Sequence, residues 1–99
     1  MASIIRNKKG FLVIKTNIVE MAATMDSPGI CDHCNKMAVN GYLVSVLNHY
    51  LCEDCYKEWM GYAENYPEDQ HIERKNMDMY IRMFHHAHIT LSEEKAEDK

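Results

Sequence analysis

Two short stretches, CDHC at residues 31–34 and CEDC at residues 52–55, decide how this chain folds. Two residues separate the cysteines of each pair, so both sulfurs can reach one ion while backbone N–H groups turn toward the thiolates. The spacer at residues 35–51 has room for a hairpin that brings the pairs together. Four thiolates about 2.3 Å from an ion form the tetrahedral, soft-ligand shell that Zn²⁺ favours. The spacing therefore predicts one structural zinc ion, and its ligands are Cys31, Cys34, Cys52 and Cys55.

Iron, disulfides and a thiol-redox pair are the alternatives to zinc. Rubredoxin-type iron loops usually carry a proline and a glycine around the cysteines, and neither residue lies between or directly after the cysteines of a pair here. A thioredoxin-like redox pair would leave the second Cys-x-x-Cys unexplained. The apolar run at residues 11–14 is too short for a secretory signal, and nothing approaches a membrane span of about 20 apolar residues. We therefore expect a cytoplasmic protein, whose reducing surroundings favour metal binding over disulfides.

The chain of 99 residues fits one domain of the α+β class, covering residues 1–99. Residues 10–29 read as an N-terminal strand (10–16) followed by a short helix (17–25). Residues 30–66 are the finger, with a strand at 42–47 and a helix from about residue 53 to residue 65, before Pro67. Residues 67–91 form a C-terminal helix, and residues 92–99 are a flexible polar tail.

The spacing and the expected order of knuckle, hairpin and helix resemble a treble-clef finger. GATA-type DNA-binding fingers and TraR/DksA-type fingers that bind RNA polymerase share this spacing, and the similarity covers residues 31–55. The GATA-type pattern continues with basic residues, whereas the helix here carries Glu53, Asp54, Glu58 and Glu64. The TraR/DksA-type pattern has a long coiled coil before the finger, which residues 1–30 do not contain. The similarity therefore implies the finger fold and neither function.

A closer resemblance is to small bacterial zinc-binding proteins of uncharacterised function. The matching motifs are C-D-x-C-N-K at 31–36, G-Y-x-V-x-V-L-N-x-Y-x-C at 41–52, E-W at 58–59 and Y-P-E-D at 66–69. Glu73, Arg74 and Asn76 match a further motif, with Lys75 inserted. This resemblance covers about residues 10–84 and implies zinc binding.

Charge is distributed unevenly along the chain. The net charge of −4 divides into +3 over residues 1–25 and −7 over residues 26–99, and four zinc-bound thiolates would add about two negative charges. An acidic surface binds phosphate backbones poorly. We therefore expect a protein partner or self-association, through the apolar faces near Met77–Phe84, and no membrane contact. A nucleic-acid-binding zinc finger is the alternative, and its basic candidates are Arg6, Lys8, Lys9 and Lys15.

The histidines have no assigned ligand role in this interpretation. His33 and His49 lie near the cysteine pairs, but four cysteines already fill a closed site. His85, His86 and His88 resemble a metal cluster, and a partly buried helix end is the favoured explanation. A second metal at these three histidines stays open.

The sequence gives little support for catalysis. A catalytic zinc keeps an open coordination position, whereas four cysteines close the site. The chain also lacks a deaminase pattern, a Gly-rich phosphate loop and a nucleophile elbow. We expect Trp59 to be buried against residues 43–47 rather than to stack on bases. The predicted function is a non-catalytic, zinc-stabilised interaction module, with a thiol-redox or metal-sensing role as a weaker alternative.

Overall fold

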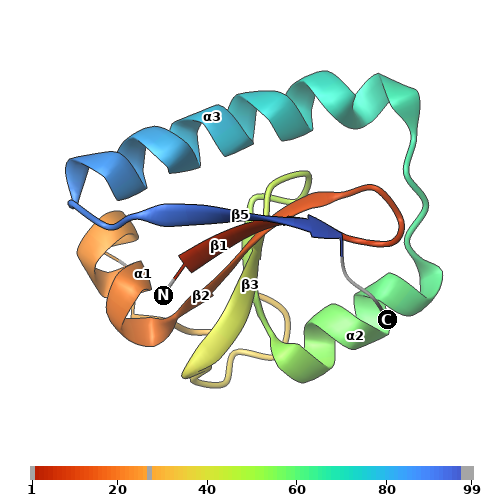
Figure 1. The fold of residues 1–99 in the computed structure, drawn as a ribbon. Helices are drawn as coiled ribbons and strands as arrows, with labels where there is room; N and C mark the ends of the chain where they lie inside the picture. Colours follow the sequence, from red (N-terminus) through yellow and green to blue (C-terminus); the bar gives the residue numbers. More distant parts are fainter. Residues whose placement is uncertain (1, 27, 97–99) are drawn as a thin grey trace.

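A five-stranded sheet lies at the centre of the structure, a computed structural model that describes residues 2–26 and 28–96 (Figure 1). The elements follow in the order β1 (Ala2–Arg6), β2 (Leu12–Asn17), α1 (Ile18–Met25), β3 (Asn40–Val44), β4 (His49–Cys52), α2 (Glu53–Tyr62), the 3-10 turn η1 (Pro67–Asp69), α3 (Gln70–His86) and β5 (Leu91–Ala96). The strand order is β4-β3-β2-β1-β5, and every neighbouring pair is antiparallel except β1 and β5, which are parallel. Among the described helices, none is both long and apolar enough to cross a membrane.

Both faces of the sheet are covered. Figure 1 shows α3 along one face and α2 on the opposite side. Successive strand residues point to opposite faces, so Val13 joins the buried cluster under α2 while Ile14 joins the cluster under α3. Residues 42–44 of β3 are all buried for the same reason. Coverage on both faces explains why the runs at residues 11–14 and 42–44 are continuously apolar instead of alternating.

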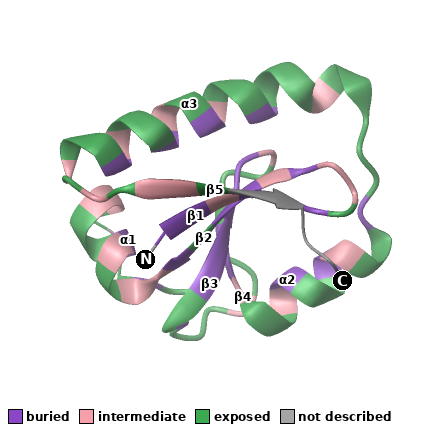
Figure 2. Ribbon diagram, in the orientation of Figure 1, coloured by how far each residue is buried: buried purple, intermediate pink, exposed green. Residues whose placement is uncertain are grey.

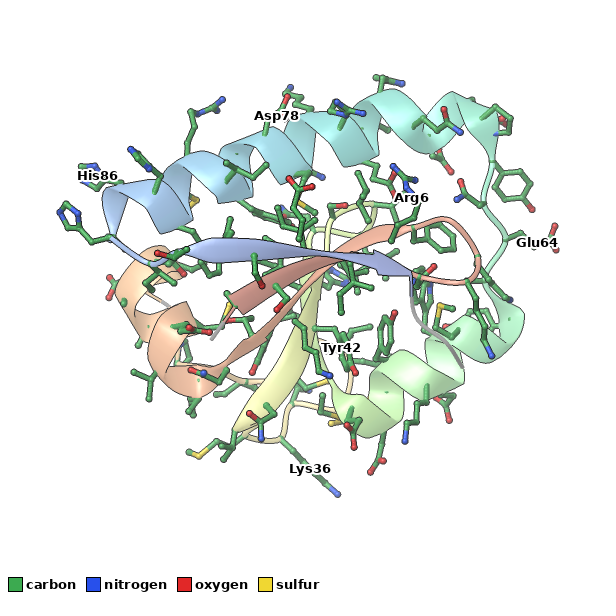
Figure 3. All side chains as sticks on the ribbon, in the orientation of Figure 1. Arg6, Lys36, Tyr42, Glu64, Asp78 and His86 are labelled. Atoms are coloured by element: carbon green, nitrogen blue, oxygen red, sulfur yellow. The ribbon has the colours of Figure 1, made fainter. Side chains whose placement is uncertain are left out.

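Helix α3 presents one side to the sheet and the other to solvent. Met77, Tyr80 and Phe84 are at most 3% exposed, and Figure 2 shows the buried residues of α3 along its sheet-facing side. Figure 3 shows Asp78 and His86 on the outer side of the same helix, pointing away from the sheet. The sheet therefore covers these three side chains, and a partner contact near Met77–Phe84 stays a prediction for the exposed residues of this stretch, such as Ile81, which is 38% exposed.

Aromatic rings fill the space between the sheet and α2. Tyr42 of β3 stacks on Tyr56 with ring centroids 3.9 Å apart, and Phe11 lies 4.7 Å from Trp59. The burial predicted for Trp59 is confirmed, since 8% of it is exposed, and Val44 belongs to the same cluster. The predicted packing against Leu43 is wrong, because strand alternation turns Leu43 toward α3.

The two ends of the described chain differ most from the sequence prediction. Strand β1 was not predicted, and the tail predicted to be flexible from residue 92 continues as β5 to Ala96, while residues 97–99 lie outside the described residues. Backbone pairing of β5 with β1 needs no apolar side chain, so the polar sequence at 91–96 does not indicate a strand. Ser3 and Ser92 add a side-chain hydrogen bond of 3.0 Å across this pair.

The internal boundaries match the prediction more closely. β2, α1 and α2 lie within a few residues of the predicted segments. β3 stops at Val44 instead of residue 47, because residues 45–48 form a turn in which Asn48 has φ 56°. The last helix is preceded by η1 and ends at His86, two residues before His88, whose φ is 62°.

Replacing Trp59 with alanine tests the packing under α2. We expect Trp59→Ala to lower the free energy of unfolding by about 3–5 kcal/mol, the range for removal of a large buried aromatic side chain. Tyr66→Ala is the matched control, because Tyr66 is 48% exposed and its loss should change stability by less than about 0.5 kcal/mol. Urea denaturation of the metal-loaded proteins measures both, and equal losses would contradict the packing described here.

Candidate metal centre

The first cysteine pair lies in a tight turn that the backbone holds closed. Ile30 pairs with Met37 in an antiparallel bridge, and the N–H of Cys31 donates to the carbonyl of Lys36 at 2.9 Å. Asn35 adopts a left-handed conformation, φ 64°, and its N–H donates to the carbonyl of Cys31 at 2.9 Å. Asparagine tolerates this conformation better than most residues. The turn therefore brings the sulfurs of both cysteines to the same side.

The second pair spans the end of β4 and the start of α2. Cys52 is the last residue of the strand and the N-cap of the helix, and Cys55 lies in the first helical turn. The positive end of the helix dipole favours thiolates at these positions. Gly41 faces Cys52 across the hairpin, where a Cβ would lie 2.6 Å from the carbonyl oxygen of Leu51. Only glycine allows this close approach of β3 to the cysteine-bearing end of β4.

The four sulfurs meet at one point. The Sγ atoms of Cys31, Cys34, Cys52 and Cys55 all lie within 4.8 Å of one another, and those of Cys34 and Cys52 are 3.8 Å apart. A tetrahedron with metal–sulfur bonds of about 2.3 Å has edges of about 3.8 Å. All four cysteines are free thiols, so no disulfide accounts for the cluster. The sulfurs are positioned to coordinate one metal ion, which fits the expected zinc.

Electrostatics at the sulfurs also favours a cation. Burial alone would raise the pKa of Cys31, but N–H groups of Cys34, Cys52 and His33 directed at its sulfur lower this pKa to about 6. Burial raises the pKa of Cys52 and of Cys55, and the sulfurs of Cys31 and Cys34 raise the pKa of each further. Such close sulfurs repel one another as thiolates, and a divalent cation among them would remove that repulsion.

Asp32 and Tyr50 fix the first pair against the hairpin. The N–H of Asp32 donates to the carbonyl of Tyr50, and the N–H of Tyr50 donates to Oδ2 of Asp32, both at 2.8 Å. The Tyr50 hydroxyl donates to the carbonyl of Ala38 at 2.8 Å. Burial, with the nearby Cys31 and Cys52, raises the pKa of Tyr50 to about 12, so it remains a neutral donor. The sequence prediction missed both residues, although the position of Asp32 directly after Cys31 was an available signal.

The histidines remain outside the four-sulfur cluster. His33 is exposed, and its Nδ1 lies 3.5 Å from Sγ of Cys55, next to the sulfurs rather than among them. His49 is exposed on β4 opposite Val44. Within residues 2–26 and 28–96, no other group of three or more His, Cys, Asp or Glu side chains converges as these cysteines do. His85, His86 and His88 therefore do not converge on a second metal site within the described residues.

Removing one sulfur tests whether the cluster acts as a unit. We expect Cys52→Ser to abolish stable metal binding and to destabilise the fold as much as loss of both pairs, because three thiolates hold the ion poorly. His33→Ala is the control and should keep one metal per chain, since His33 is not one of the four clustered ligands. Native mass spectrometry measures the metal content. One tightly held metal in Cys52→Ser would contradict the four-sulfur assignment.

Comparisons with known proteins identify no relative of this chain. Searches against models of protein families, against curated proteins and against solved structures found no match for this chain. The metal centre is therefore assigned from the four sulfurs and their surroundings alone.

Proposed function

We propose that this chain is a non-catalytic interaction module, stabilised by one structural zinc ion, that binds another protein. The observation that carries the proposal is the convergence of four cysteine sulfurs within 4.8 Å. Four protein ligands complete the tetrahedral shell of zinc and leave no position for a substrate or an activated water. A closed site of this kind stabilises a fold instead of performing a reaction.

The donor set and the order of elements support zinc in a treble-clef arrangement. Four thiolates in a tetrahedron suit Zn²⁺, and a reducing compartment such as the cytoplasm would keep the cysteines available as metal ligands instead of disulfides. The first pair lies in the turn at residues 31–35, the hairpin β3–β4 follows, and α2 begins at the second pair. These elements occur in the order of a treble clef, with the last two ligands at the start of the helix.

Surface charge and exposed apolar side chains support a protein partner. Residues 26–99 carry a net charge of −7, which disfavours contact with a phosphate backbone. Large apolar side chains are exposed on and beside the finger, including Met37 at 70%, Val39 at 61% and Tyr62 at 66%. A protein surface that covers these residues removes apolar surface from water, which is favourable.

The structure supports the nucleic-acid alternative less than the sequence does, because of the contacts made by its basic candidates Arg6, Lys8, Lys9 and Lys15. Nζ of Lys9 donates to the carbonyl of Ala63 at 2.7 Å, next to the C-terminus of α2, and Nη1 of Arg6 donates to the carbonyl of Gly10 at 2.7 Å. Two of the four cations therefore already have contacts within the chain. Lys8 and Lys15 are exposed, but two lysines supply few phosphate contacts.

Metal content and its removal test the zinc assignment. We expect one zinc ion per chain by native mass spectrometry and loss of cooperative unfolding after chelation, because the ion joins segments that share a thin core. Circular dichroism during thermal unfolding, with and without chelator, measures the second effect. An iron charge-transfer absorption in the purified protein, or unchanged unfolding after chelation, would contradict a structural zinc.

Fluorescence anisotropy with labelled DNA and RNA separates the two classes of partner. We expect no binding to random duplex DNA or to single-stranded RNA at physiological salt, because the surface is mainly acidic. The measurement is made at two salt concentrations with the zinc-loaded protein and with the triple variant Arg6→Ala, Lys8→Ala, Lys9→Ala. Micromolar binding that weakens steeply with salt and disappears in the triple variant would replace the protein-binding proposal with the nucleic-acid finger.

A further inference from the structure

A cavity of about 330 Å³ opens beside the metal centre, between the turn before β4 and helix α2. Its lining includes the aromatic, aliphatic and acidic side chains of Trp59, Tyr62, Leu47, Leu51, Asp32 and Glu58, together with His33, His49 and the metal-centre residue Cys55. Among the residues whose side chains are described, no lysine or arginine lines it. Ligand pockets range from about 300 to 1,000 Å³, so this cavity has the size for one side chain rather than for a large cofactor.

The aromatic wall of the cavity is rigid on one side and open on the other. Trp59 is 8% exposed and is fixed by Phe11, whose ring centroid is 4.7 Å away. Tyr62, at the last residue of α2, is 66% exposed. An exposed tyrosine beside a fixed tryptophan offers π-surface to an incoming group without a rearrangement of the core.

The acidic side chains give this aromatic wall a preference for cations. Asp32 is held in place because its Oδ2 accepts the N–H of Tyr50 at 2.8 Å. Glu58 lies on α2, one turn before Tyr62. Residues 26–66 carry a net charge of −4, so the surroundings of the cavity add to the same potential. Carboxylates next to aromatic rings attract a positively charged group and disfavour an anion.

We infer that this cavity binds an arginine side chain of the protein partner, an inference that rests on the proposed protein-binding function. A guanidinium is planar and weakly hydrated, so it can lie against an aromatic ring while its N–H groups donate to carboxylates. The cavity supplies both features, with Trp59 and Tyr62 as the rings and Asp32 and Glu58 as the carboxylates. Partner binding at this cavity would also explain the exposed Tyr62, which is not part of the metal centre.

A pair of capped tripeptides tests the inference with the zinc-loaded protein. Gly-Arg-Gly is the probe, and Gly-citrulline-Gly is its neutral control of nearly the same shape. Trp59 is the one tryptophan in the chain, so its fluorescence reports on this cavity. We expect saturable quenching or enhancement by the arginine peptide, with a Kd on the order of 1 mM, and a response at least about fivefold weaker with the citrulline peptide.

Matched variants assign the response to the cavity. Glu58→Gln and Tyr62→Ala should each weaken arginine-peptide binding about two- to fivefold. Glu64→Gln and Tyr66→Ala are the controls, because both residues are exposed, lie just beyond α2 and do not line the cavity. Native mass spectrometry confirms that each variant retains its zinc. No response to the arginine peptide, an equal response to citrulline, or equal weakening by the control variants would each overturn the inference.

The outcome is separable from that of the proposed function. If a purified protein partner binds and Glu58→Gln and Tyr62→Ala leave its affinity unchanged, the arginine site is refuted while the protein-binding function stands. If the anisotropy assay instead shows salt-sensitive nucleic-acid binding, the function itself is refuted.

Discussion

The convergence of four cysteine sulfurs, positioned to coordinate one metal ion, is the constraint on which the cysteine-bearing half of this protein depends. The turn at residues 31–35, the end of β4 and the first turn of α2 approach one another at their sulfurs. Without a cation, the same approach would place mutually repelling groups side by side. The cluster also continues into the core, because Cys31 is fully buried and belongs to the apolar cluster beneath α2. We therefore expect metal binding and the packing of α2 on the sheet to be one cooperative event.

The other half of the molecule is organised by ordinary packing. Helix α3 contributes Met77, Tyr80 and Phe84 to a cluster on the opposite face of the sheet, away from the cluster that contains Cys31. Strands β2 and β3 supply side chains to both clusters, since their residues alternate between the faces. The two clusters are therefore connected through these shared strands. We expect loss of a bound metal ion to weaken the packing of α2 directly and that of α3 only through the shared strands.

Sequence reasoning succeeded where a local pattern carried the information. Fixed cysteine spacing located the metal centre, and apolar periodicity located α1, α2 and α3. It failed at β1 and β5, because their pairing joins residues about 90 positions apart through backbone groups that every sequence possesses. Sequence reasoning also could not show what covers the apolar stripe of α3, since periodicity identifies an apolar face without identifying its neighbour. Asp32 and Tyr50 were missed because their hydrogen bonds form only once the hairpin and the turn meet.

The parallel pairing of β1 with β5 has a consequence for the order of folding during synthesis. Residues 2–6 emerge from the ribosome well before their partners at 91–96. The four cysteines, by contrast, lie within residues 31–55, so their sulfurs can meet before residues 91–96 have emerged. Long-range pairing is slow because the entropy of loop closure is lost before the stabilising contacts form. The sheet is therefore completed late, and until β5 pairs with it β1 keeps an open edge that chaperones or neighbouring nascent chains can reach.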